Sequence, residues 1–245
     1  MVINVHGGHN RIVPGASGYL DEVTEDRAVT AQVIAKLRAL GHTVYDCTDD
    51  SGRTQGQNLA NIVHACNAHA ADLDVSIHLN SGGGTGTEVL VYSDTGEAAG
   101  YAVKICAAIS ELGYRNRGVK ERKALYVLRR TTAPALLVEC CFVDSAADAQ
   151  RFDADKMAAA IVRGITGQTA AQTGAAPAQQ TGYHVRITAS VLNVRRDHSA
   201  SSAVATQVRR GEVYTIVAEY NNGGTMWGKL KSGAGWIALN YTQSV

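Results

Sequence analysis

The sequence predicts an α/β domain, with a mostly parallel twisted sheet flanked by helices, followed by a small all-β barrel. Three observations lead to this prediction. Up to residue 167, apolar runs of strand length alternate with segments whose apolar residues recur at helical spacing. From residue 183 onward, short runs rich in Val, Ile, Tyr and Thr are separated by Gly and Asn clusters. The 245 residues, 45% of them hydrophobic, suffice for one medium domain and one small one.

The elements of the first part follow one another in a regular order. A strand at Val2–Val5 is followed by a helix over 24–40, because Val29, Val33 and Leu37 recur at helical spacing, and Gly41 ends this helix. Further strands are expected at Thr43–Tyr45, Asp74–Leu79, Thr87–Tyr92, Leu125–Leu128 and Leu136–Val143, and further helices around Leu59–Cys66, over 97–112 and over about 145–164. This alternation indicates βαβ units and therefore a mostly parallel sheet.

The second part begins after a segment of distinct composition. Residues 168–182 contain no charge, no aromatic residue and no large aliphatic residue, so we expect a flexible linker between domains at 1–167 and 183–245. The strands expected after it are His184–Thr188, Val191–Val194, Val213–Val217, Trp227–Leu230 and Trp236–Leu239. Short strands with turn residues between them favour a small all-β barrel.

Charge and composition exclude several classes of protein. The formal net charge of +1 argues against a nucleic-acid partner, and no apolar run approaches the roughly 18 to 20 residues of a membrane helix, so no membrane insertion is expected. The near-neutral net charge is the sum of an acidic first part and a basic second part. Residues 1–167 carry 16 Lys and Arg against 19 Asp and Glu, whereas residues 168–245 carry 7 against 3. The second part is therefore basic.

The cysteines and the N-terminus indicate where the chain is made. The five cysteines are odd in number and scattered over the first part, which is not the pattern of a disulfide framework and is typical of a reducing compartment. Met1 leads directly into Val2–Val5, without the basic start and long apolar stretch of a signal peptide. We expect synthesis in the cytoplasm without a signal peptide.

Polar residues lie at the ends of several expected strands. His9 follows the first strand, His78 ends the strand Asp74–Leu79, and Glu139 lies inside the apolar run Leu136–Val143. Ligands of open α/β sheets bind at the carboxyl ends of the strands, so these side chains are expected to converge. A carboxylate in an apolar run is costly to bury without a function or a partner, and histidine with carboxylate is a ligand set that Zn²⁺ prefers.

These residues carry a resemblance to a known family. Gly8-His9 with Pro14-Gly15-Ala16, the run Ser76-Ile77-His78-Leu79-Asn80, and Val138-Glu139 resemble the motifs of the type 3 N-acetylmuramoyl-L-alanine amidases. The resemblance covers about residues 1–167. It implies that His9, Glu22 and His78 are the ligands of one catalytic zinc ion and that Glu139 is the catalytic carboxylate.

Two ligand positions have competitors. Asn4 stands where the family has an acidic residue, and Asn10-Arg11 follow His9, so His6 competes with His9. His9 is preferred because it keeps the Pro-Gly-Ala motif at the expected offset. Glu25 competes with Glu22, which is preferred for its spacing to Gly41. Asp21 and Asp26 are interpreted as solvated acids at a helix start.

The resemblance also implies the reaction. A zinc-activated water would attack the amide bond between N-acetylmuramic acid and L-alanine in bacterial peptidoglycan, with Glu139 as general acid and base. Asn80, and Lys120 in the basic cluster 116–123, are candidates for substrate binding. We interpret the glycine-rich segment 82–86 as a flexible turn beside the site.

The second part resembles a bacterial SH3-like domain, through Val191-Leu192-Asn193-Val194-Arg195, Gly211-Glu212, Trp227 and Gly235-Trp236-Ile237. This resemblance implies binding to the cell wall, and the positive charge suits anionic wall polymers or peptide carboxylates. Together the two resemblances suggest a phage endolysin that acts on the wall after release from the cytoplasm, with a bacterial autolysin as the nearest alternative.

Two other functions remain open on the sequence. Cys140 or Cys141 could serve, with a histidine, as the nucleophile of a wall peptidase, since SH3-like domains accompany such enzymes. The chain could also bind the wall without catalysis, with the first domain as a scaffold. Loss of activity on chelation would favour the zinc enzyme, and loss on thiol alkylation would favour the peptidase.

Overall fold

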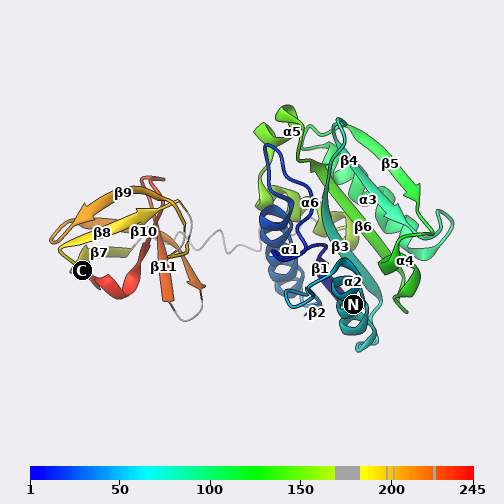
Figure 1. Cartoon of the computed structure of the whole chain (residues 1–245), viewed down its shortest axis with the longest axis horizontal. Helices are drawn as coiled ribbons and strands as arrows, with labels where there is room; N and C mark the ends of the chain where they lie inside the picture. Colours follow the sequence, from blue (N-terminus) through cyan, green and yellow to red (C-terminus); the bar gives the residue numbers. More distant parts are fainter. Residues whose placement is uncertain (169–182, 197, 201, 223–224) are drawn as a thin grey trace. The chain divides into compact units, whose positions relative to one another are not determined.

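The computed structural model describes residues 1–168, 183–196, 198–200, 202–222 and 225–245. The chain divides into two compact units, Met1–Ala171 and Gln172–Val245 (Figure 1). Apart from Gln168, the predicted linker 168–182 lies outside the described residues. Among the described helices, none combines the length and the apolar character needed to cross a membrane.

The first unit is built on a six-stranded sheet with the strand order β2-β1-β3-β6-β4-β5. Neighbouring strands pair in parallel except β4 and β6, which pair antiparallel, so the prediction of a mostly parallel sheet is confirmed. The strands are β1 (Val2–Gly7), β2 (Thr43–Asp46), β3 (Leu73–Asn80), β4 (Thr87–Val91), β5 (Asn116–Glu121) and β6 (Ala135–Phe142).

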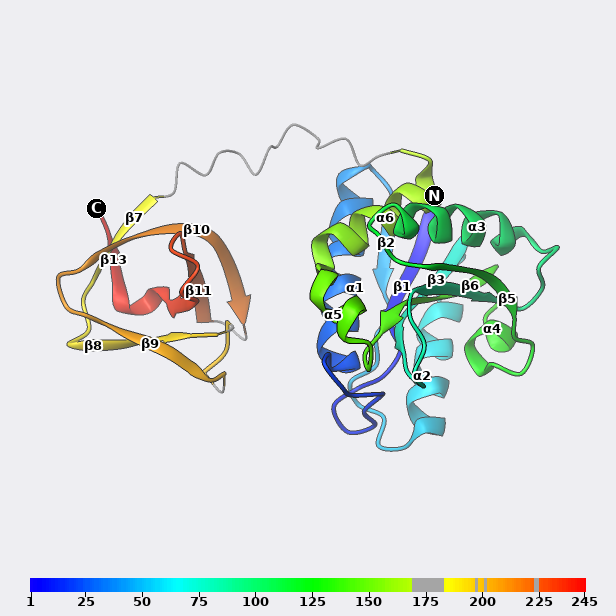
Figure 2. The same ribbon diagram turned by 90° about the horizontal axis from the view of Figure 1, so that it is seen from above.

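Helices cover both faces of this sheet. They are α1 (Glu22–Ala39), α2 (Gln55–Asn67), α3 (Glu97–Ser110), α4 (Tyr126–Arg130), α5 (Ala146–Arg151) and α6 (Ala154–Thr166). The main core joins one face of the sheet to α1, α3 and α6 through side chains such as Leu37, Ile105 and Ile161. A smaller cluster joins α2 to α4 through Ile62 and Val127, and Figure 2 shows these two helices across the sheet from α3 and α6.

Three predicted elements of this unit differ from the structure. The predicted strand Leu125–Leu128 is wrong, because Leu125 caps the short helix α4 and the next residues are helical. The basic cluster 116–123, for which no strand was predicted, contains the edge strand β5. The helix expected over about 145–164 is interrupted, since Asp153 caps a second helix by accepting from the backbone N–H groups of Asp155 and Lys156.

The topology brings the ends of five strands to one edge of the sheet. β1, β3 and β6 run in the same direction, so their carboxyl ends lie together. β4 runs antiparallel to β6 and β5 runs parallel to β4, which places the first residues of β4 and β5 at the same edge. Side chains from β3, β6, β4 and β5 can therefore meet there, together with the loop that follows β1.

The second unit is all β, as predicted from its sequence. One seven-stranded sheet has the order β13-β7-β10-β11-β12-β8-β9. Its elements are β7 (Tyr183–Ile187), β8 (Val191–Arg195), β9 (Val204–Arg209), β10 (Val213–Asn222), β11 (Thr225–Leu230), β12 (Trp236–Ala238), a 3-10 turn at Leu239–Tyr241 and β13 (Thr242–Ser244). Val194, Ile216 and Ile237 lie in its own hydrophobic core. The SH3-like barrel remains a prediction.

Candidate active site

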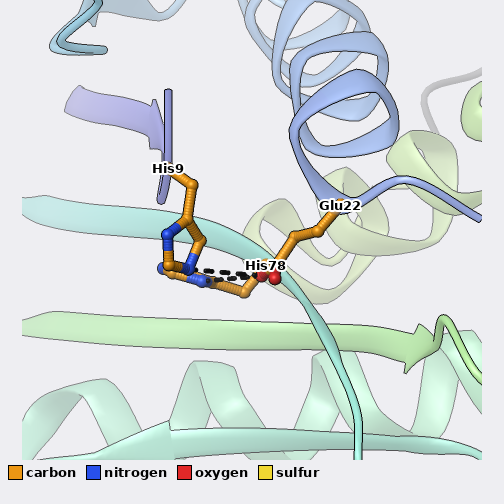
Figure 3. Close-up of side chains that lie close together, drawn as sticks. All are labelled: His9, Glu22 and His78. Carbon is orange, nitrogen blue, oxygen red and sulfur yellow. Dashed lines mark hydrogen bonds and ion pairs between the residues drawn. The ribbon is translucent and has the colours of Figure 1, made fainter. Parts of the chain in front are cut away.

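Three of the predicted site residues come together at this edge of the sheet. His9 lies in the loop after β1, Glu22 is the first residue of α1, and His78 lies near the end of β3. One donor atom from each of these side chains lies within 4.8 Å of the other two (Figure 3). Two imidazole nitrogens and one carboxylate oxygen at this spacing form a set of donors that can hold one metal ion.

Glu22 is fixed in this group by several hydrogen bonds. Its Oε1 atom lies 3.1 Å from Nδ1 of His78 and accepts the backbone N–H of Leu79 at 3.1 Å. Its Oε2 atom accepts the backbone N–H of Ala16 at 2.7 Å. Oε1 is also 3.7 Å from Nε2 of His9. The carboxylate is buried, yet both of its oxygens are held, so its position does not depend on a bound ligand.

Two glycines leave space for this arrangement. A Cβ atom on Gly8 would lie 1.8 Å from Cε1 of His78, and a Cβ atom on Gly15 would lie 2.2 Å from Oε2 of Glu22. Any larger residue would therefore collide with a candidate ligand. This explains in structural terms why glycine stands at these two positions of the sequence.

The electrostatic environment differs among the three side chains. Burial and the positive charge of His78 lower the pKa of His9, so its imidazole is neutral and able to bind a cation. Burial by itself would lower the pKa of His78, but the hydrogen bond to Glu22 and the nearby carboxylates raise it. Burial opposes ionisation of Glu22, whereas the hydrogen bond and charge of His78 lower its pKa.

Asp26 and Arg27 hold the loop that carries His9. Oδ2 of Asp26 accepts the backbone N–H groups of Gly8 at 3.2 Å and His9 at 3.5 Å. Arg27 donates to Oδ1 of Asp26 at 3.0 Å and to the carbonyl oxygen of His9. Asp26 is fully buried, and burial raises its pKa to about 7. Its interpretation as a solvated helix-start acid is therefore wrong, whereas exposed Asp21 caps α1.

Glu139 lies directly beside this group. It pairs with His78 across β3 and β6, and residues directly opposite each other point to the same face of a sheet. Its Oε2 atom is buried and has no hydrogen-bond partner among the described residues. Burial, reinforced by the charges of Glu22 and Glu88 and opposed by His78, raises its pKa to about 7. A carboxyl group with this pKa can exchange a proton near neutral pH.

A second buried carboxylate was missed at the sequence level. Glu88, on β4, pairs with Glu139 across the antiparallel strands. It accepts from the side-chain amide of Asn80 at 3.1 Å and from Nε of Arg117 at 2.7 Å. A Glu in the short apolar strand 87–91 is the same signal that singled out Glu139. Asn80, a predicted substrate-binding residue, uses its amide N–H on Glu88.

The remaining candidates lie apart from the three ligands. His6 is fully buried and burial lowers its pKa to about 3, while the side chains that come together are those of His9, Glu22 and His78 and not those of His6 or Glu25. Lys120 pairs with Leu90, two residues farther from this edge than Glu88. Its predicted role in substrate binding stays a prediction.

The glycine-rich turn is tied to the sheet. Asp144 accepts the backbone N–H groups of Gly82 at 2.8 Å and Gly83 at 2.7 Å. Buried Asp148 accepts those of Gly86 at 2.7 Å and Phe142 at 3.1 Å. Two carboxylates thus anchor the turn that connects β3 to β4 next to His78.

Comparison with known proteins finds an uncharacterized relative and a named amidase. An uncharacterized protein of Clostridium perfringens is 38% identical over 154 residues, which are 60% of this chain and 45% of that protein. The chain thus spans less than half the length of this relative. A sporulation-specific N-acetylmuramoyl-L-alanine amidase of Bacillus subtilis is 31% identical over 209 residues, which are 83% of this chain and 80% of that protein.

A solved structure and a protein family agree with these relatives. The catalytic domain of the CD27L endolysin, which targets Clostridium difficile, is 26% identical and superposes with a TM-score of 0.64 over 69% of this chain and 98% of that domain. The Amidase_3 family, described as N-acetylmuramoyl-L-alanine amidase, matches residues 1–167. Since this match covers well over half of the 245 residues, the chain belongs to the Amidase_3 family of N-acetylmuramoyl-L-alanine amidases.

Proposed function

We propose that this chain hydrolyses the amide bond between N-acetylmuramic acid and L-alanine in bacterial peptidoglycan, as a zinc-dependent amidase. The observation that carries the proposal is the convergence of His9, Glu22 and His78 beside a buried carboxyl group, Glu139. Membership in the amidase family supports the reaction, and the name of the Bacillus subtilis relative, an N-acetylmuramoyl-L-alanine amidase, supports the substrate.

The residues present fit a zinc ion. His9, Glu22 and His78 supply two imidazole nitrogens and one carboxylate oxygen, and three protein ligands with one open position are typical of catalytic zinc. The unpartnered oxygen of Glu139 next to them is suited to a water molecule at the open position. When bound, zinc would lower the pKa of such a water molecule and polarise the substrate carbonyl.

Glu139 moves the proton in the proposed reaction. Its carboxylate accepts a proton from the attacking water, and the resulting carboxylic acid delivers the proton to the amine nitrogen of L-alanine as the amide bond breaks. Burial keeps its pKa near 7, so both protonation states are accessible at neutral pH. Glu22, Asp26 and Arg27 keep the ligands and the His9 loop in position during this step.

The cysteine peptidase is less well supported. Cys140 and Cys141 are both fully buried, and burial raises the pKa of each thiol far above its ordinary value. A nucleophilic cysteine requires a lowered pKa and access to substrate. Both side chains lie in the main hydrophobic core, where they fill space.

We also propose that the second unit binds an anionic wall polymer or the peptide carboxylates of peptidoglycan. Its excess of Lys and Arg supports this role. A cavity of about 770 Å³ in this unit is lined by Arg195, Asn193, Trp227 and Tyr241, among others. Aromatic walls with a few polar groups are typical of ligand sites.

In the cell, we propose that the protein is a phage endolysin, made in the cytoplasm and acting on the wall after release. The similarity to the endolysin catalytic domain supports this assignment. A bacterial autolysin remains the second candidate, because the Bacillus subtilis relative is a sporulation amidase. The two roles share one chemistry.

Product analysis on purified cell wall tests the proposed reaction. We expect new L-alanine amino termini without new reducing sugars, complete loss of both activity and products after chelation, and recovery on addition of zinc. Glu139→Gln should lower the rate of cleavage by at least about 100-fold while the protein still binds the wall, since loss of a general acid-base residue typically costs 10²–10⁴ in rate. Undiminished cleavage by this variant would contradict the assignment.

A further inference from the structure

Arg117 is held rigidly at the same sheet edge as Glu139. Its Nε atom donates to Oε2 of Glu88 at 2.7 Å, and its Cζ atom lies 4.9 Å from the centroid of the Phe142 ring. The side chain is 31% exposed, so it is not closed off from solvent. β5, β4 and β6 lie side by side in Figure 1. An arginine fixed in this way is placed for recognition beside the reaction site.

Glu88 determines where the guanidinium lies. Both of its oxygens are engaged, one by Asn80 at 3.1 Å and the other by Arg117, and its side chain is only 9% exposed. Glu88 stands directly opposite Glu139. Cβ atoms of directly opposed residues are about 5 Å apart, so the guanidinium bonded to Glu88 lies on the order of 5–10 Å from the Glu139 carboxyl group.

The Arg117 guanidinium has more donors than the one that binds Glu88. In the part of the chain that the structure describes, Nε is the Arg117 nitrogen that makes a hydrogen bond. The two terminal nitrogens therefore present their N–H groups in the fork geometry that suits a carboxylate. The bond from Nε already pairs the charge of Glu88 with that of Arg117. The N–H groups of the two terminal nitrogens are not needed for this pairing.

The proposed substrate has a carboxylate at a matching distance. N-acetylmuramic acid, on the acyl side of the scissile bond, offers no carboxylate when its lactyl group is amidated. On the amine side, the second stem residue can carry a free α-carboxylate, two residues from the scissile bond. At about 3.3–3.6 Å per residue, that carboxylate lies about 7 Å from the scissile amide.

We propose that Arg117, oriented by Glu88 and Phe142, binds the free α-carboxylate of the second residue of the stem peptide and so determines which stem chemistry is cleaved. This proposal rests on the amide hydrolysis proposed above. A peptide in which this carboxylate is a carboxamide presents no negative charge to Arg117. The site should therefore prefer stems with the carboxylate.

Two soluble fragments that differ in one group test this proposal. N-acetylmuramoyl-L-alanyl-γ-D-glutamyl-L-lysinamide carries the free α-carboxylate, and the matching D-isoglutaminyl fragment carries the carboxamide. In both fragments the γ-carboxyl group of the second residue and the C-terminus are amides, so no other carboxylate competes for Arg117. With the zinc-loaded full chain, we expect kcat/KM to be about tenfold higher for the carboxylate, because hydrogen bonds between charged groups are worth more than neutral ones. In Arg117→Gln the ratio of the two kcat/KM values should fall to about one.

Two further variants separate recognition from folding. Glu88→Gln combined with Arg117→Gln removes both charges, so no buried carboxylate is left unpaired, and this double variant should also lose the preference. Arg122→Gln is a matched control, because Arg122 is exposed and follows the opposite end of β5, and the preference should survive. Melting temperatures check that each variant is folded.

The outcomes distinguish this proposal from the proposed function. Cleavage of both fragments at equal kcat/KM by the unmodified protein would overturn the role of Arg117 and leave the amidase intact. A preference that persists in Arg117→Gln would overturn it as well. If the unmodified, zinc-loaded protein cleaves neither fragment although it is folded, the proposed amide hydrolysis fails and the role of Arg117 fails with it.

Discussion

Single residues decide how closely the three candidate ligands approach one another. Gly8 and Gly15 lie in the loop between β1 and α1, against His78 and Glu22. Neither glycine has a positive φ angle, so the requirement is for space and not for an unusual backbone conformation. The loop passes so close to the ligands that a single added methyl group must displace one of them.

Gly8→Ala tests this requirement. The added Cβ would lie 1.8 Å from Cε1 of His78, so the imidazole must move. We expect bound zinc to be lost and the rate on soluble fragments to fall by about 100-fold, since displacements near 1 Å can cost this much. Gly100→Ala is the control, because a Cβ on Gly100 in α3 meets nothing within 4 Å. Full metal content and rate in Gly8→Ala would contradict the expectation.

Asp74 gives a prediction for the dependence of stability on pH. It is buried, and burial, opposed by a hydrogen bond from Asn4, raises its pKa to about 6. The folded protein therefore binds a proton more tightly than the unfolded chain, in which the pKa is about 3.9. This contribution to stability is complete below about pH 4 and is lost as pH rises through about 6.

The measurement compares the unmodified protein with Asp74→Asn in urea. As pH rises from 4 to 7, the free energy of unfolding of the unmodified protein should fall by about 2–3 kcal/mol relative to the variant, because each pKa unit is worth about 1.4 kcal/mol. Groups elsewhere titrate in both proteins and cancel in the difference. A difference that does not change with pH would show that Asp74 keeps the same charge on folding.

Residues of the site were predictable to the extent that their sequence neighbours are distinctive. His9, His78 and Glu139 stand at or in apolar strands, where a polar side chain is conspicuous. Asp26 was misinterpreted because acids are common in the first turns of helices. It lies four residues after Glu22, on the same face of α1, and this spacing turns it inward toward the His9 loop.

Whole elements were predicted well where burial is two-sided and poorly at the edge of the sheet. β3 and β6 are buried on both faces and read as continuous apolar runs. β5 is an edge strand with charged residues, which is a common way to protect an edge from further pairing but resembles a loop in sequence. α4 is too short for helical periodicity to distinguish it from a strand.

α5 provides a test at the level of elements, because its buried Asp148 joins three segments. It accepts the backbone N–H groups of Gly86 and Phe142 and pairs with Arg151 at 3.2 Å. Asp148→Ala should lower the free energy of unfolding by about 3 kcal/mol, since it leaves buried N–H groups and a cation without their partner.

Urea denaturation measures this effect, with Asp155→Ala as the matched control. Asp155 also pairs with a cation, Lys36, at 2.7 Å, but it is 64% exposed. Surface pairs contribute about 0–1 kcal/mol, so this variant should change stability little. Equal effects of the two substitutions would mean that Asp148 does not join the turn to β6 and α5.

At the scale of the whole molecule, charge divides along the same line as structure. The acidic residues prevail in the unit with the candidate metal site, and the basic residues prevail in the all-β unit. In the sequence, the uncharged segment 168–182 separates two different patterns of apolar residues, which is why we predict two domains. The arrangement of strands in the second unit was less predictable, since β9 and β13 lack a distinctive apolar alternation.

Removing the second unit should therefore separate wall binding from catalysis. A chain of residues 1–171 should cleave soluble muramoyl-peptide fragments at the rate of the full chain, because all candidate ligands lie in the first unit. On intact walls it should act about tenfold or more slowly, since a tethered binding unit raises the local concentration of substrate.

Because the second unit is basic, the advantage of the full chain should shrink as salt is added and screens the attraction. The turbidity of wall suspensions, followed between about 20 and about 500 mM NaCl, measures this effect. Over this range the Debye screening length falls from roughly 20 Å to roughly 4 Å. Equal lysis by both chains at low salt would show that the second unit does not direct the enzyme to the wall.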